Sequence, residues 1–328
     1  MDWSTLRHRL LGHVPGDVTP PLLGMAAIPT VVTEFCRAAD RSEISHVELA
    51  AILDRDQGLV VEVLKVVNSA ATGVRRKVNS SRAAIALLGI KRAKRLVLIS
   101  GVQASSQKSK SPFGATTAFS FAALQRAIFA RRLADRLGLD DELAFAGALL
   151  QDFTIPSLTA ELPERYRTLV EELQQSGDSL SDRERSRAGW DHAFAGANMM
   201  LHWGLPDDLV CLTLLHHRLD QILKSRRLGT SEALPVALSA LLPDPLDNRP
   251  ERIAQLEEIL SARFGIEVDA FRLWVCEDLN YAGMPVNEHL SWNAAALRQG
   301  ADRPKSGSRS CRPIDQVATR TISNSCKN

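Results

Sequence analysis

The side chains best suited to chemistry in this sequence are one aspartate and three histidines: Asp152, His192 and the adjacent pair His216-His217. Imidazole nitrogens and carboxylate oxygens bind divalent transition metals well, and a metal held by such groups can activate water. Gln151 directly precedes Asp152. Because a neutral glutamine amide is a poor replacement for an imidazole ligand, this position points away from metal-dependent catalysis.

Other catalytic chemistries have little support. The sequence contains no Gly-x-Ser-x-Gly nucleophile motif and no Gly-x-x-x-x-Gly-Lys phosphate-binding loop. Cys36 and Cys211 lie in apolar helical patterns, which predict inert core thiols. The five cysteines are widely scattered and form no Cys-x-x-Cys motif, so we expect neither a disulfide framework nor a zinc finger.

Composition sets the broad class of the protein. A chain of 328 residues with 45% apolar residues is typical of a soluble globular protein with a substantial core. The net charge of +2 creates no global field that would demand a nucleic acid or an anionic membrane as partner. The N-terminal residues lack a signal-peptide pattern and no apolar run reaches about 18 residues, so we expect a cytoplasmic protein without membrane contact.

The apolar pattern recurs at three and four residues and predicts an all-α protein. Ser45 and Glu48 form a capping box that opens a helix from about His46 to Leu53. Asp56 can cap the next helix, which ends near residue 68. A third helix starts at Ser80 or Ser81 and is expected to stop at Gly89, with a further helix from about Lys91.

The same reasoning places the four chemical residues near helix ends. Predicted helices cover residues 119–137, 142–150, 163–175, 190–203 and a segment from Pro206 to the His216-His217 pair. The helix at 142–150 thus ends at Gln151-Asp152. Helical patterns persist to about residue 298, whereas residues 300–328 have little apolar periodicity and are expected to form a disordered tail.

A second candidate surface is basic. Arg75, Arg76 and Lys77 precede Arg82, and Lys91, Arg92, Lys94 and Arg95 follow on a helix where Lys91, Lys94 and Arg95 share one side. Such a cluster could contact phosphates, but residues 74–100 contain no aromatic side chain on which bases could stack. A solvated helix face is the simplest interpretation, with a partner-docking surface (Arg75, Arg76, Lys91, Lys94, Arg95) and a nucleotide or nucleic-acid contact as alternatives.

Several separated motifs occur in one order along the chain. They are Ile28-Pro29, Leu53-Asp54-Arg55-Asp56, residues 64–70, 78–81 and 84–89, then residues 144–150, Glu184, Asp191-His192-Ala193, Gly196, residues 203–206 and His216-His217. Together they resemble the HDOD domain family over residues 21–220. The resemblance implies an all-α, HDOD-type multi-helix bundle related to the HD superfamily of metal-dependent phosphohydrolases. It also implies a bacterial signalling or regulatory module.

The resemblance also implies that the metal-binding set is incomplete. Related enzymes take a first histidine from an early helix and a His-Asp pair from a helix end. Here residues 120–130 contain no histidine, and the pair is Gln151-Asp152. Asp152, His192, His216 and His217 could still converge in a vestigial cleft that binds a ligand. The simplest interpretation is that they serve as caps and hydrogen-bonding groups within the bundle. The alternatives are a residual metal or anion site that uses Asp152, His192 and one of His216 or His217, and an active phosphohydrolase.

The sequence therefore predicts a non-catalytic regulatory protein that binds a signalling partner or a small ligand, without a cofactor or bound metal. Its predicted parts are an N-terminal segment (1–20), an HDOD domain (21–220), a C-terminal helical extension (221–299) and the tail (300–328). The alternatives are a weak metal-dependent phosphodiesterase with a remodelled site and a nucleic-acid-binding regulator that uses the segment from Arg75 to Arg95. Partner, signal and oligomeric state stay open.

Overall fold

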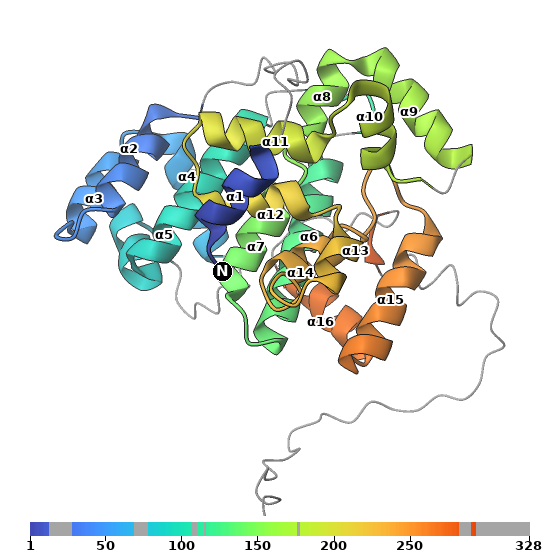
Figure 1. Ribbon diagram of the computed structural model, residues 1–328. Helices are drawn as coiled ribbons and strands as arrows, with labels where there is room; N and C mark the ends of the chain where they lie inside the picture. Colours follow the sequence, from blue (N-terminus) through green and yellow to red (C-terminus); the bar gives the residue numbers. More distant parts are fainter. Residues whose placement is uncertain are drawn as a thin grey trace, which may run out of the picture.

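A computed structural model describes residues 1–12, 28–68, 78–106, 110–114, 116–175, 178–281 and 290–292. Every regular element within these ranges is a helix, as the apolar periodicity predicts (Figure 1). The helices are α1 (Trp3–Leu11), α2 (Thr30–Ala39), α3 (His46–Leu53), α4 (Gln57–Asn68), α5 (Ser81–Ser106), α6 (Thr116–Arg136), α7 (Asp141–Leu150), α8 (Ile155–Glu161), α9 (Pro163–Gln175), α10 (Leu180–Ala188), α11 (His192–His202), α12 (Asp207–Leu215), α13 (Leu219–Lys224), α14 (Ala233–Ser239), α15 (Pro250–Phe264) and α16 (Val268–Tyr281).

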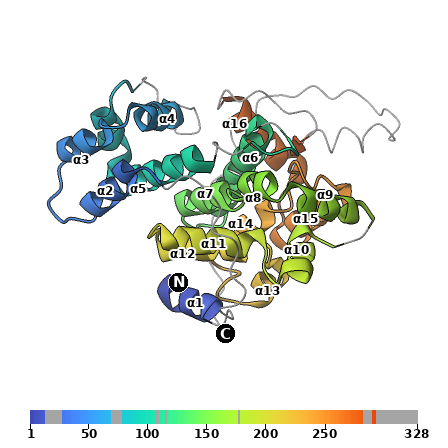
Figure 2. The same ribbon diagram turned by 90° about the horizontal axis from the view of Figure 1, so that it is seen from above.

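Helices α2 to α5 gather at one end of the molecule, to one side of the remaining helices (Figure 2). The capping box that opens α3 is formed: the Ser45 hydroxyl accepts a hydrogen bond from the Glu48 amide, and the Glu48 carboxylate accepts one from the Ser45 amide. The Asn68 side chain at the end of α4 makes two 2.7 Å hydrogen bonds to the backbone of Val78. It thereby fixes the segment that enters α5.

The predicted break at Gly89 takes the form of a kink. Helix α5 spans this position, but Gly89 has φ 75° and ψ 161°, which is not helical. Glycine adopts this backbone region without the steric cost that a Cβ atom imposes. Helices α1, α2, α8 and α10 were not predicted individually from the sequence. Arg75 and Arg76 of the basic surface and the predicted tail at 300–328 lie outside the described residues.

Helix α7 lies in the centre of the molecule, and its residues from Leu143 to Leu150 are all buried. Gly147 lets α12 and α14 pack closely on this helix. A Cβ atom at Gly147 would lie 2.7 Å from Leu212 Cδ1 and 3.2 Å from Val236 Cγ2. The close packing fixes the end of α7, which carries Asp152 into the cleft.

The C-terminal extension packs onto α6. Phe129 of α6 makes edge-on ring contacts with Phe271 of α16 and with Trp292, at centroid distances of 5.6 and 5.5 Å. The fully buried Gln125 side chain donates a 3.0 Å hydrogen bond to the Leu290 carbonyl and accepts a 2.9 Å hydrogen bond from the Trp292 amide. The extension therefore shares a core with the helices that precede it.

We expect Gln125→Leu to lower the free energy of unfolding by about 2–4 kcal/mol, because two buried backbone groups lose their partner. Urea unfolding followed by circular dichroism measures the change. Gln255→Leu is the control, since Gln255 is exposed on α15. Equal stability of the two variants would show that the contact between Gln125 and the extension contributes nothing.

None of the described helices is long and apolar enough to cross a membrane.

Candidate functional site

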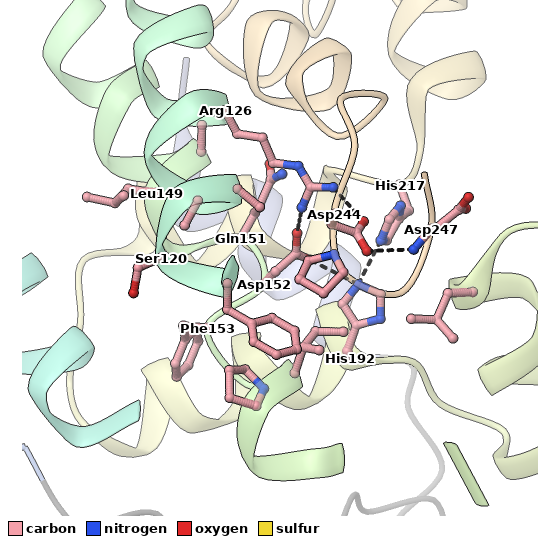
Figure 3. Close-up of a pocket in the computed structure, with 18 of the residues that line it drawn as sticks. Ser120, Arg126, Leu149, Gln151, Asp152, Phe153, His192, His217, Asp244 and Asp247 are labelled. Atoms are coloured by element: carbon pink, nitrogen blue, oxygen red, sulfur yellow. Dashed lines mark hydrogen bonds and ion pairs between the residues drawn. The ribbon is translucent and has the colours of Figure 1, made fainter. Parts of the chain in front are cut away.

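The four residues singled out in the sequence converge in one place, at the ends of three helices. Figure 3 shows three of them, Asp152, His192 and His217. Asp152 follows α7, His192 is the first residue of α11, and His216 and His217 follow α12. One donor atom from each side chain lies within 4.8 Å of the others. The convergence that the resemblance implied is therefore present in the structure.

Buried hydrogen bonds fix the orientation of His192. Its Nδ1 lies 2.6 Å from Glu184 Oε2, and the same carboxylate oxygen accepts a 2.8 Å hydrogen bond from the His192 amide. The hydroxyl of Tyr166 donates to the other oxygen of Glu184 at 2.6 Å. All three residues are at most 1% exposed. This chain of contacts leaves His192 Nε2 directed at the cluster.

His216 is held in a similar way. Its Nδ1 lies 2.6 Å from the Thr213 carbonyl, which can only accept, so this nitrogen carries the proton. In the neutral ring the Nε2 lone pair is then free, and it lies 3.1 Å from Asp152 Oδ1 and 3.3 Å from His192 Nε2. His217 Nε2 lies 2.7 Å from His192 Nε2.

This arrangement fits a single transition-metal ion. A tetrahedral ion with bonds of about 2.0–2.1 Å holds its donor atoms about 3.3 Å apart. The Nε2 and Oδ1 atoms of Asp152, His192 and His216 are 3.1–3.3 Å apart, which is this spacing. His217 Nε2 lies 2.7 Å from His192 Nε2 and is a candidate for the fourth ligand after a small adjustment of its ring. Metal-binding histidines also commonly donate their other N–H to a carboxylate or a carbonyl, as His192 and His216 do here.

The neighbouring charges shift the pKa values of two of these histidines in opposite directions. Burial lowers the pKa of His192, but the Glu184 charge and hydrogen bonds to Asp152 and Glu184 raise it well above its usual value. Burial and the nearby His216 and His192 lower the pKa of His217 well below its usual value. A metal bound at His192 Nε2 would displace any proton on this nitrogen.

Arg126 of α6 is the part of the site that the sequence did not predict. It is 2% exposed and donates to Asp152 Oδ2, to Asp244 Oδ2 at 2.6 Å and to the Leu242 carbonyl at 2.9 Å. Burial raises the pKa of Asp152, but the Arg126 charge, together with smaller effects of the neighbouring histidines, holds it well below its usual value. Helix α6 therefore supplies a permanent cation to the site.

Two of the positive charges of the basic surface are paired with nearby carboxylates. Lys94 Nζ lies 2.5 Å from Asp40 Oδ1, and the Arg95 guanidinium makes two 3.0 Å hydrogen bonds to Asp140. Lys91 is exposed. Part of the positive charge on this helix side is therefore neutralised locally, and a docking role for the surface remains a prediction.

Comparison with known proteins decides the family. A sequence profile of the HDOD domain matches residues 25–219, more than half of the chain. The chain belongs to the HDOD domain family. An uncharacterized protein from Treponema pallidum is 22% identical over 196 residues. The alignment covers 58% of this chain but only 37% of that longer protein.

Solved structures agree with an HDOD fold. An HDOD domain protein of unknown function from Geobacter sulfurreducens superposes with a TM-score of 0.55 at 17% identity, covering 90% of this chain and 93% of that chain. A candidate phosphohydrolase from Shewanella amazonensis gives a TM-score of 0.56 at 20% identity, covering 83% and 90% of the two chains. At these identities the likeness establishes the fold alone.

Proposed function

We propose that this chain is a regulatory HDOD protein whose cleft holds one divalent transition-metal ion as a fixed part of the structure, and that it acts by binding and not by hydrolysis. The observation that carries the proposal is the donor set: Asp152, His192, His216 and His217 together offer four protein ligands. The sequence alone favoured a cleft without a metal. The convergence of these donors favours the residual metal site that the sequence left open.

The number of donors argues against hydrolysis. Catalytic zinc sites usually have three protein ligands and keep a fourth position for water, whereas structural sites fill all four positions with protein atoms. A metal held by all four side chains would have no such position for a water nucleophile.

Arg126 supports the same conclusion. Phosphoester hydrolysis by two metals needs carboxylates that are free to bind the second ion. Asp152 Oδ2 and Asp244 Oδ2 both accept hydrogen bonds from the Arg126 guanidinium instead. The guanidinium cannot lose its charge and presents no lone pair, so it balances these carboxylates without activating water.

The test combines metal content and turnover. Full-length protein without an affinity tag is incubated with Mn²⁺, Fe²⁺ or Zn²⁺, desalted and analysed for metal, and then assayed with bis-p-nitrophenyl phosphate. We expect about one ion retained per chain and no hydrolysis above that of the free metal. Metal-dependent hydrolysis that is abolished by Asp152→Ala would instead support the weak phosphodiesterase that the sequence left as an alternative.

A further inference from the structure

A pocket with about 80 Å³ of internal space, partly open to solvent, adjoins the histidine cluster. Its polar end is formed by residues that Figure 3 labels, among them Arg126, Asp152, His192 and Asp247. The remaining walls are largely apolar and come from α6, α7, α8 and α10. They include Phe119, Ala123, Leu149, Phe153, Ile155 and Leu180. The pocket has the mixed lining of a small-molecule site, mostly apolar with a few polar groups at one end.

The charged groups that line the pocket are already paired with one another. Arg126 bonds Asp152 and Asp244, as described above. Arg252 lies 2.7 Å from Asp247, which also receives hydrogen bonds from the Arg249 guanidinium at 2.9 Å. An anionic or cationic ligand would have to break one of these buried pairs, which is costly because the partner keeps its charge.

One uncharged donor in the lining has no partner. The Gln151 side chain is 1% exposed, and its Oε1 lies 3.3 Å from the hydroxyl of Ser239. Its Nε2 has no hydrogen-bond partner. Leaving a buried amide N–H unsatisfied costs free energy, so the site favours a molecule that brings an acceptor atom to Gln151.

We propose that this pocket binds a small, uncharged, largely apolar molecule that carries a carbonyl or similar oxygen, which accepts a hydrogen bond from Gln151 Nε2. The apolar walls provide the affinity and the Gln151 amide provides the orientation. Paired charges at the polar end exclude nucleotides and other phosphorylated compounds. In the regulatory role proposed above such a molecule would be the signal, but its binding does not require the metal.

Three fluorescent probes distinguish the effects of the apolar walls, the Gln151 amide and the paired charges on binding. Prodan is neutral and has a ketone, N-phenyl-1-naphthylamine is neutral without an acceptor oxygen, and 1-anilinonaphthalene-8-sulfonate is the second probe with an added negative charge. We expect saturable binding of both neutral probes to full-length protein, and binding of the sulfonate at least about tenfold weaker than its neutral parent. EDTA treatment should not abolish binding, so failure of the metal proposal is distinguishable from failure of this one.

Two variants locate the probe. Ala123→Trp fills the pocket and should weaken both neutral probes at least about tenfold, whereas Ala254→Trp on the exposed face of α15 should not. Gln151→Met should weaken prodan about three- to tenfold and leave N-phenyl-1-naphthylamine unchanged. Two results with the unmodified protein overturn the proposal: no saturable binding of the neutral probes, or binding of the sulfonate that is as tight as or tighter than binding of its neutral parent. An equal effect of Gln151→Met on both neutral probes also overturns it, because that result is expected if Gln151 only binds a water molecule.

Discussion

Arg126→Met lowers the free energy of unfolding by about 3–5 kcal/mol, because removal of one partner from a buried ion pair leaves the other partner charged and uncompensated. Here two carboxylates lose their counter-ion. Asp152 keeps the histidines, but Asp244 retains only the 2.8 Å hydrogen bonds from the Leu246 and Asp247 amides and a distant Arg252 at 3.9 Å. Urea unfolding at neutral pH measures the loss.

The control comes from the same helix. Arg132 of α6 pairs with Asp278, but its side chain is 42% exposed, so Arg132→Met should cost less than about 1 kcal/mol. The double variant Arg126→Met with Asp244→Asn should recover part of the stability, because it removes one uncompensated charge. If Arg126→Met were as stable as Arg132→Met, Arg126 would not be the internal cation of the site.

His216→Ala weakens metal binding by more than about 100-fold. Loss of a group that merely orients a ligand costs about 10–100-fold in metal affinity, and loss of a ligand itself should cost more. Competition with a chromophoric chelator such as 4-(2-pyridylazo)resorcinol gives the affinity of each variant. We expect His216 to be a ligand because its Nε2 lies 3.1 Å from Asp152 Oδ1, while its Nδ1 is held by the Thr213 carbonyl.

His202→Ala is the matched control for this measurement. His202 is the last residue of α11, the helix that begins with His192, and it is exposed. Its removal should leave the metal affinity unchanged. An equal loss in both variants would indicate nonspecific binding to surface histidines, and no loss in His216→Ala would remove His216 from the site.

The local signals in the sequence were strong enough to predict much of the fold. Helix α3 begins and ends at the predicted residues because the Ser45 and Glu48 pair marks its start, and α9 spans the predicted 163–175. Helix α10 was missed although Ser179 and Asp182 form a capping box. Its residues are mostly polar, so the apolar periodicity that supports the other predictions is absent there.

The site was predictable only in part. The groups that orient His192 and balance the charge of Asp152 come from distant segments of the chain. Glu184 belongs to the motifs that resemble the family, but its bond to His192 required the fold. The sequence does contain one indication that Arg126 is special, since it is a charged residue within an apolar, alanine-rich helix pattern. Its partner Asp244 lies 118 residues further along the chain, and no local pattern connects the two.

The central claim is that the cleft holds a metal whose ligands all come from the protein. X-ray absorption spectroscopy of the zinc-loaded, full-length protein tests it most directly, because it reports the number and type of atoms bound to the metal. We predict four nitrogen or oxygen ligands at about 2.0–2.1 Å, three of them imidazoles. A five- or six-coordinate ion with fewer imidazoles would contradict the closed site, and a protein that retains no zinc would contradict the metal centre itself.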